Sequence, residues 1–172
     1  MNADMERAAL AMAEPTDEER LLVVGFGPGV GLVALLDRVT PASVLAVDPS
    51  PAMMRTAQRR LAVHRHGDLV ELRAVPAVDI SCPPRFDAAL AVNAEQLWDP
   101  HGASVHAVGD ALRPGGRFVS LTHQWAITKH HSLSAWQRLV EADLAAAGFE
   151  TPIWSESRYR SGPGVGWVTR KR

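Results

Sequence analysis

The segment from residue 21 to residue 32 constrains the fold of this chain more than any other. Its sequence is LLVVGFGPGVGL. The apolar run at 21–24 predicts a strand buried on both faces, and the glycines at 25, 27 and 29 predict a tight turn that a ligand can approach closely. A helix that begins after the turn directs its free N–H groups toward that ligand. The segment therefore predicts a ligand-binding strand–turn–helix unit.

A second strand, VLAV at 44–47, follows about twenty residues later and ends at Asp48. An acidic residue in this place can accept hydrogen bonds from two ribose hydroxyls. Strand, glycine turn, helix, strand and acid together predict a nucleoside-containing ligand. No Gly-Lys-Ser/Thr follows the turn, so the pattern is not a phosphate-binding P-loop.

Four segments of the chain, in order, resemble the motifs of the class I S-adenosylmethionine-dependent methyltransferases. They are VGFGPG at 24–29, DPSPAMM at 48–54, FDAALAVN at 86–93 and LRPGGRF at 112–118. The resemblance covers residues 21–123 and continues more weakly through Ala147-Gly148-Phe149. It implies a methyltransferase whose cofactor is S-adenosyl-L-methionine.

Alternating strands and helices predict an α/β fold with a mostly parallel, doubly wound sheet. The resemblance adds seven strands in the order 3-2-1-4-5-7-6, with the last strand antiparallel. We expect strands at 21–24, 44–47, 69–74, 86–92, 117–122, 149–155 and 165–170. We expect helices that end near residues 13, 38, 63, 112 and 147, and loops at 75–85 and 123–131. We expect residues 1–20 to form an N-terminal helical segment, either a lid over the cofactor or a surface helix or frayed terminus, and 21–172 to form one methyltransferase domain.

Hydrophobic spacing predicts which side of two helices faces the core. The helix after the glycine turn directs Val30, Val33 and Ala34 inward. The helix before Gly148 directs inward Leu133, Trp136, Leu139, Val140 and Leu144.

The family resemblance assigns cofactor contacts to residues at the carboxyl ends of the strands. Gly25, Phe26, Gly27 and Gly29 form the turn beneath the methionyl group, and Asp48 holds the ribose. Pro49 and Met53 flank the adenine, with Met53 as a core residue being the alternative. Pro76 and Ala77 lie where the family meets the adenine amino group, and Asn93 lies near the methionyl group or the acceptor, or caps a turn.

Methyl transfer from a sulfonium is an in-line displacement that depends mainly on alignment, and it needs a base only when the acceptor must lose a proton. His123 and Glu95 are the candidate catalytic residues, with a solvent-facing loop histidine as the alternative for His123. Trp98 and Trp125 are candidates for lining the acceptor pocket. His130 and His131 read as surface residues, and no spacing indicates a metal site.

The chain departs from the family at two positions. Val23 stands where the family has an acidic residue that helps to hold the glycine loop and the methionine amino group. Pro76 offers no N–H to the adenine. These departures leave open a second hypothesis, a binding or regulatory protein with this fold but without methyl transfer. A third, an NAD-linked dehydrogenase, requires its third glycine where Val30 stands, and Gly31 comes one residue late.

The amino-acid composition limits the kinds of partner and location that we expect. The net charge of −1 provides no basic field for nucleic acid, and a single cysteine, Cys82, excludes an intrachain disulfide. No apolar run is long enough to cross a membrane and no signal peptide is evident, so we expect a cytoplasmic protein of one domain. We expect a small-molecule methyl acceptor. Its pocket is open, completed by the termini, or completed by the second subunit of a homodimer.

Overall fold

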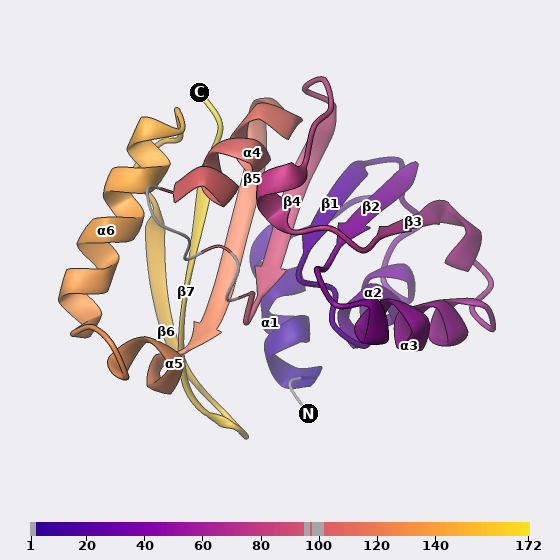
Figure 1. The fold of residues 1–172 in the computed structure, drawn as a ribbon, viewed down its shortest axis with the longest axis horizontal. Coiled ribbons are helices and arrows are strands. Elements are labelled where there is room, and N and C mark those ends of the chain that lie inside the picture. Colours follow the sequence, from indigo (N-terminus) through magenta and orange to yellow (C-terminus); the bar gives the residue numbers. More distant parts are fainter. Residues whose placement is uncertain (1–2, 95–96, 98–101) are drawn as a thin grey trace.

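The computed structural model describes residues 3–94, 97 and 102–172 of the chain. Seven strands form one sheet in the order β3-β2-β1-β4-β5-β7-β6, as Figure 1 shows. The strands are β1 (Arg20–Val24), β2 (Ser43–Val47), β3 (Val70–Arg73), β4 (Phe86–Val92), β5 (Leu112–His123), β6 (Ile153–Tyr159) and β7 (Gly162–Arg170). Strands β1 to β5 are parallel, and β7 is antiparallel to both of its neighbours. The predicted strand order and the antiparallel last strand are confirmed.

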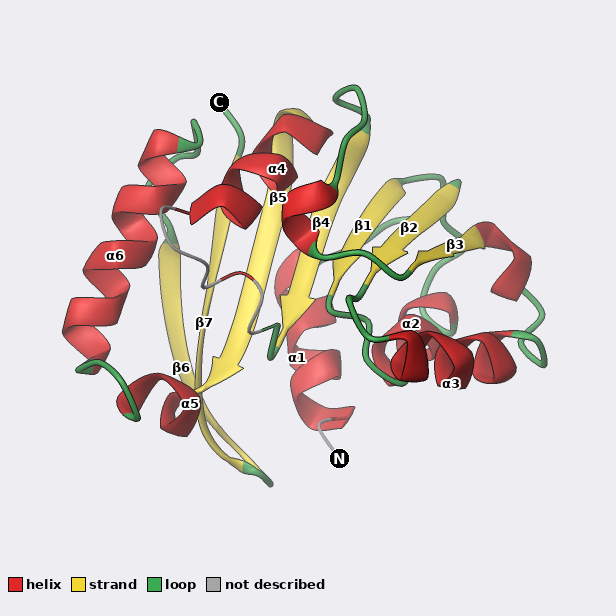
Figure 2. Ribbon diagram, in the orientation of Figure 1, coloured by secondary structure: helices red, strands yellow, loops and turns green. Residues whose placement is uncertain are grey.

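Helices cover both faces of the sheet (Figure 2). They are α1 (Ala3–Ala13), α2 (Val30–Leu36), α3 (Pro51–Leu61), α4 (Ala103–Ala111), α5 (Gln124–Thr128) and α6 (Leu133–Ala146), with 3₁₀ turns η1 (Gly67–Leu69) and η2 (Ala77–Asp79). One face packs against α1, α2 and α3, and the other packs against α4, α6 and η2. None of the helices in the described part of the chain is long and apolar enough to cross a membrane.

Two apolar cores, one on each face, explain why the central strands read as continuous apolar runs. In β1, Leu22 and Val24 belong to the core beneath α4 and α6, while Leu21 and Val23 pack in the core beneath α1 and α2. A parallel strand buried on both sides needs apolar residues at every position. This double burial fixes the glycine turn at the carboxyl end of β1.

The prediction of the inward face of α2 is only partly right. The fully buried residues of this helix are Leu32, Leu35 and Leu36, which were not predicted. Val33 and Ala34 are half-buried and pack against the same core, and Val30 is half-buried. The helix sequence is VGLVALL, which is apolar on every side, so its pattern does not select a face. In α6, Leu139 was also expected inward, but it is 52% exposed.

Three boundaries also differ from the prediction, and a fourth is not tested. The loop expected at 123–131 contains α5, and the strand expected at 149–155 lies at Ile153–Tyr159 and turns directly into β7. The turn at 114–116 lies within β5 as an irregularity, because Phe86 pairs with Leu112 while Ala88 pairs with Arg117. Helix α4 begins at Ala103, and the start predicted at 99–100 lies outside the described residues.

A half-buried ion pair fastens the end of α1 to β5. The Arg117 guanidinium donates to both Glu19 carboxylate oxygens, at 2.9 and 2.7 Å, and to the Ala13 carbonyl oxygen at 2.8 Å. Burial alone would raise the pKa of Glu19, but the hydrogen bonds from Arg117 and from the Thr16 N–H outweigh it and lower that pKa. The pair therefore holds α1 against the sheet.

Removing the cation should destabilise the fold. We expect Arg117→Ala to lower the free energy of unfolding in urea by about 2 kcal/mol, because it leaves the Glu19 carboxylate and the Ala13 carbonyl without their donor. The matched control is Arg158→Ala, since Arg158 is exposed on β6. We expect the control to change stability by less than about 0.5 kcal/mol. Equal effects of the two substitutions would contradict this role of Arg117.

Candidate functional site

The glycine turn between β1 and α2 forms the floor of the candidate site. Gly27 and Gly29 both adopt left-handed backbone conformations, with φ of 50° and 82°. A Cβ added to Gly27 would meet nothing within 4 Å, whereas one added to Gly29 would lie 3.0 Å from the Cβ of Ala57 in α3. Gly27 therefore faces open space that a ligand can enter, and Gly29 allows α2 and α3 to pack closely.

Asp48, which follows β2, ties this turn to the neighbouring strand. Its side chain is only 8% exposed. One carboxylate oxygen accepts from the Gly27 N–H and the other from the Ser50 N–H, both at 2.9 Å. Each oxygen retains a lone pair for a further donor. The location predicted for Asp48, directly after the second strand, is confirmed.

The residues that begin α3 lie open beside Asp48. Ser50 caps the helix by accepting from the Met53 N–H at 3.3 Å, and Pro51 occupies the first helical turn. Pro49 is exposed, and Met53 is 37% exposed. Met53 is therefore not the core residue that the alternative supposed.

The segment after β3 contributes little side-chain chemistry. Pro76 precedes η2 in an extended conformation and is half-buried. The Ala77 methyl group is fully buried in the core beneath α4. What this segment can offer a ligand is its backbone and the proline ring.

Asn93 joins the ends of β4 and β5. Its φ of 50° is left-handed, which asparagine tolerates better than most residues. Its side-chain oxygen accepts from the His123 N–H at 3.1 Å, and its amide donates to the Met5 sulfur of α1 at 3.7 Å. The capping alternative for Asn93 therefore describes its contacts in this structure.

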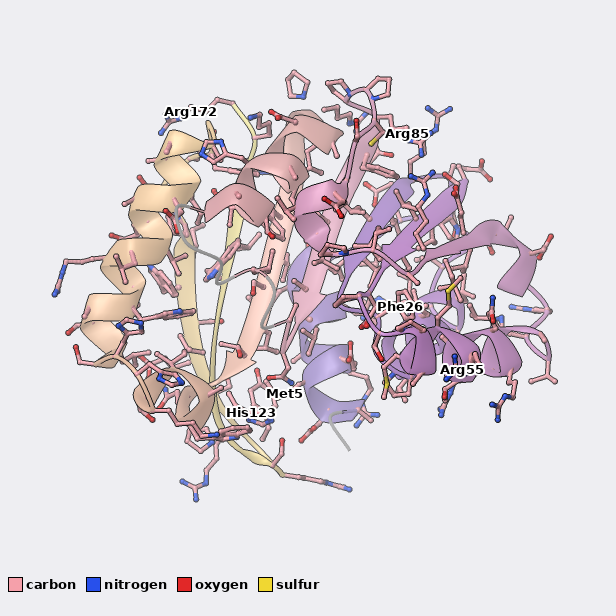
Figure 3. The ribbon with its side chains drawn as sticks, viewed as in Figure 1. Met5, Phe26, Arg55, Arg85, His123 and Arg172 are labelled. Atoms are coloured by element: carbon pink, nitrogen blue, oxygen red, sulfur yellow. The ribbon has the colours of Figure 1, made fainter. Side chains whose placement is uncertain are left out.

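His123 is the last residue of β5, and it is buried rather than facing solvent. Its side chain is 4% exposed, and its ring stacks on Trp125 at a centroid distance of 5.6 Å. Figure 3 shows Met5 and His123 at the same lower end of the central strands. The Lys129 ammonium group lies over the Trp125 ring, 4.5 Å from its centre.

The other residues predicted for the acceptor side are either exposed or outside the described part of the chain. Trp125 is half-exposed, and His130 and His131 are exposed at the end of α5. Glu95 and Trp98 lie outside the described residues. Among the residues that are described, no group of three His, Cys, Asp or Glu side chains could hold a metal ion.

The sequence patterns did not single out Glu6 of α1, which lies at the glycine turn. A methyl group on Gly31, in the first turn of α2, would overlap the Glu6 carboxylate. The small pocket around this carboxylate is lined by Val23, Gly25, Phe26, Gly31, Val92 and four leucines. Burial raises the pKa of Glu6 to about 7. A signal was available: Glu6 precedes the buried Leu10 by four residues, the spacing of one helix face.

The comparison with known families decides between the hypotheses left open by the sequence. Residues 21–116, more than half of the chain, match the family model of a methyltransferase domain. The chain belongs to the class I S-adenosylmethionine-dependent methyltransferases. The methyltransferase is thus an enzyme whose methyl donor is S-adenosylmethionine, and the dehydrogenase alternative is set aside.

Individual relatives agree with this family. The methyltransferase is 28% identical over 139 residues to the uncharacterized methyltransferase YdaC of Bacillus subtilis, covering 78% of this chain and 74% of YdaC. It is 32% identical over 112 residues to a trans-aconitate 2-methyltransferase of Methylobacterium nodulans, covering 63% of this chain but 39% of that enzyme.

A solved structure matches the fold over nearly the whole chain. Geranyl diphosphate C-methyltransferase from Streptomyces coelicolor, crystallised with S-adenosyl-L-homocysteine, superposes with a TM-score of 0.79 at 16% identity. The match covers 99% of this chain and 81% of that one. At 16% identity this similarity shows a shared fold and no more.

The residues at the turn fit the chemistry of the cofactor. Open space above Gly27 leaves room for a ligand, and Asp48 beside it is a group that accepts hydrogen bonds from hydroxyls. The methionyl part of the cofactor carries an ammonium group, and a second carboxylate, Glu6, lies at the same turn. Carboxylate acceptors are thus available for both the nucleoside hydroxyls and the amino-acid ammonium group.

The raised pKa of Glu6 makes stability depend on pH. A raised pKa favours the folded state fully below pH 4.5, where the carboxyl is protonated in both states, and this contribution is lost as pH rises through about 7. We expect the stability of the wild type, relative to Glu6→Gln, to fall by about 3 kcal/mol across this window. Urea unfolding at a series of pH values measures it. A difference that stays constant with pH would contradict the assignment.

Proposed function

We propose that this methyltransferase transfers the methyl group of S-adenosylmethionine to a small-molecule acceptor that binds at the carboxyl ends of β4 and β5. The observation that carries this proposal is the position of α1. Its N-terminal end, α5 and the tip of the β6–β7 hairpin surround that edge of the sheet (Figure 1). Such an enclosure favours a small acceptor over a folded protein or a nucleic-acid duplex.

Direct contacts hold this enclosure together. The Asp4 carboxylate accepts from the Arg160 N–H of the hairpin at 2.8 Å, and Met5 is fully buried beside Asn93. The Ser161 hydroxyl donates to the Met5 sulfur at 3.9 Å. These contacts support the role of residues 1–20 as a lid over the domain formed by 21–172.

The cofactor contacts that we propose follow the geometry of the turn. Gly25, Phe26, Gly27 and Gly29 lie beneath the methionyl group, and Asp48 accepts from the ribose hydroxyls through charge-assisted hydrogen bonds. The exposed Pro49 and Met53 flank the adenine, and the backbone around Pro76 and Ala77 meets its edge. Asn93 fixes the end of β4 beside the methionyl group.

The chemistry needs little from the protein beyond alignment. S-adenosylmethionine supplies an activated methyl group when bound, so holding the acceptor in line can contribute roughly 7–11 kcal/mol of the barrier. An acceptor that must lose a proton also needs a base. His123 is the candidate for that base among the described residues, because its imidazole ring can accept a proton and it lies buried at the enclosed edge.

Two further observations favour a small acceptor. The net charge of −1 provides no basic field to attract nucleic acid. One relative is named for trans-aconitate, a small molecule. A second subunit completing the pocket and a cytoplasmic location both stay predictions from the sequence.

Fractions of a cell extract, offered separately as methyl acceptors, test the proposal. Purified protein is incubated with S-adenosylmethionine and with separate fractions of a cell extract: metabolites below about 1 kDa, intact proteins, and RNA. We expect S-adenosylhomocysteine to form with the metabolite fraction only, since the enclosed edge admits small molecules. Formation with protein or RNA and not with metabolites would overturn the small-acceptor proposal while leaving the methyltransferase assignment intact.

A substitution tests His123 as the base. With the acceptor found in this way, we expect His123→Gln to lower kcat by about 100-fold, because general-base catalysis typically contributes that much or more. The affinity for S-adenosylhomocysteine should stay the same. His131→Gln, at an exposed position, is the matched control. An unchanged kcat in His123→Gln would exclude the histidine as a base.

A further inference from the structure

The end of β1 lacks the acidic residue that the family places there. Val23 occupies the position two residues before Gly25. Its side chain packs on the face of the sheet covered by α1 and α2. A valine there cannot help to hold an ammonium group, so the amino-acid end of the cofactor needs a different anion.

The Glu6 carboxylate lies in the pocket that Val23 lines. It comes from α1, which packs against α2, β4 and β5. Glu6, Val23 and Gly25 border one small pocket, and a Cβ on Gly31 would overlap the Glu6 carboxylate, which would then have to shift. The glycine at residue 31 therefore makes room for a carboxylate that reaches across from another helix.

The pocket around Glu6 has no cation among its described lining residues to balance the charge of the carboxylate. In the described residues that line the pocket, Glu6 is the one ionisable side chain. Other charged groups on the adjoining elements are engaged or distant: Asp4 accepts from the Arg160 N–H, Arg7 is exposed, and Arg20 and Asp87 lie together at the amino ends of β1 and β4. Helix α2 carries no charged residue.

A carboxylate held in this way is costly unless a ligand compensates for it. Desolvation is the cause of the raised pKa of Glu6, about 7. No hydrogen bond or ion pair to its carboxylate is found within the described part of the chain. A cation that enters with a ligand would lower the cost of ionisation.

We propose that Glu6 takes the place of the missing strand acid and binds the α-ammonium group of the cofactor's methionyl part. The inference goes beyond the proposed acceptor and depends only on the cofactor of the family. Because Glu6 and Met5 are adjacent in α1, a cofactor held by Glu6 also fixes the helix that borders the acceptor side. Cofactor binding and closure of the N-terminal segment are then one event.

Calorimetry with two ligands tests this role. S-adenosylhomocysteine carries the α-ammonium group, whereas 5′-methylthioadenosine has the same nucleoside without the amino-acid end. We expect Glu6→Gln to weaken binding of S-adenosylhomocysteine by about 10- to 100-fold, the usual effect of losing a hydrogen bond between charged groups. Binding of 5′-methylthioadenosine should not change. Glu14→Gln, exposed at the other end of the helix, should affect neither ligand.

Rescue and pH dependence separate a charge effect from a packing effect. We expect Val23→Asp to restore part of the S-adenosylhomocysteine affinity in the Glu6→Gln background, since it returns an acid to the strand. In the wild type, affinity should rise between pH 6 and pH 8 as Glu6, with its pKa of about 7, ionises. The Glu6→Gln variant should lack this rise.

Three results would overturn the inference, and they are distinguishable. Equal S-adenosylhomocysteine affinity in wild type and Glu6→Gln would make Glu6 a packing residue. Loss of both ligands in Glu6→Gln would show a structural defect of the turn. Failure of the wild type to bind either ligand would remove the cofactor site itself, and the inference with it.

Discussion

The hydrogen bond from the Gly27 N–H to the Asp48 carboxylate, 2.9 Å long, organises the candidate site. It joins the turn after β1 to the turn after β2. Because β1 and β2 are parallel and Val24 pairs with Val47, both turns begin at the same edge of the sheet. The left-handed conformation of Gly27 points its N–H at the carboxylate and keeps the other side of the turn open. The fold thus presents a free acceptor beside free space, which a nucleoside requires.

Helix α1 contributes more to this site than its position at the start of the chain suggests. Arg117 holds its end against the sheet, while Asp4 and Met5 connect its beginning to the hairpin and to Asn93. Between these anchors, Glu6 reaches the glycine turn. The single helix therefore borders both the glycine turn and the carboxyl end of β4, and its contacts link the two.

Most of the fold and the cofactor turn could be predicted from the sequence because their signals are local. The glycines, the acid after β2 and the apolar central strands each carry their meaning within a few residues. The inward face of α2 could not be predicted, since VGLVALL is apolar on every side. Glu6 was missed for a different reason. Its spacing to Leu10 marks the buried side of α1, but it does not show that the carboxylate meets Gly31, which lies 25 residues away in the sequence. The burial of His123 likewise depends on α5, where the sequence indicated a loop.

The proposed cofactor site places S-adenosylmethionine over the glycine turn, between Asp48 and Glu6. A crystal structure of the protein with S-adenosylhomocysteine tests it most directly. We expect ribose hydroxyls within hydrogen-bond distance of the Asp48 carboxylate and the amino-acid end of the ligand beside Glu6. Ligand density elsewhere in the molecule, or a ribose that does not contact Asp48, would contradict it.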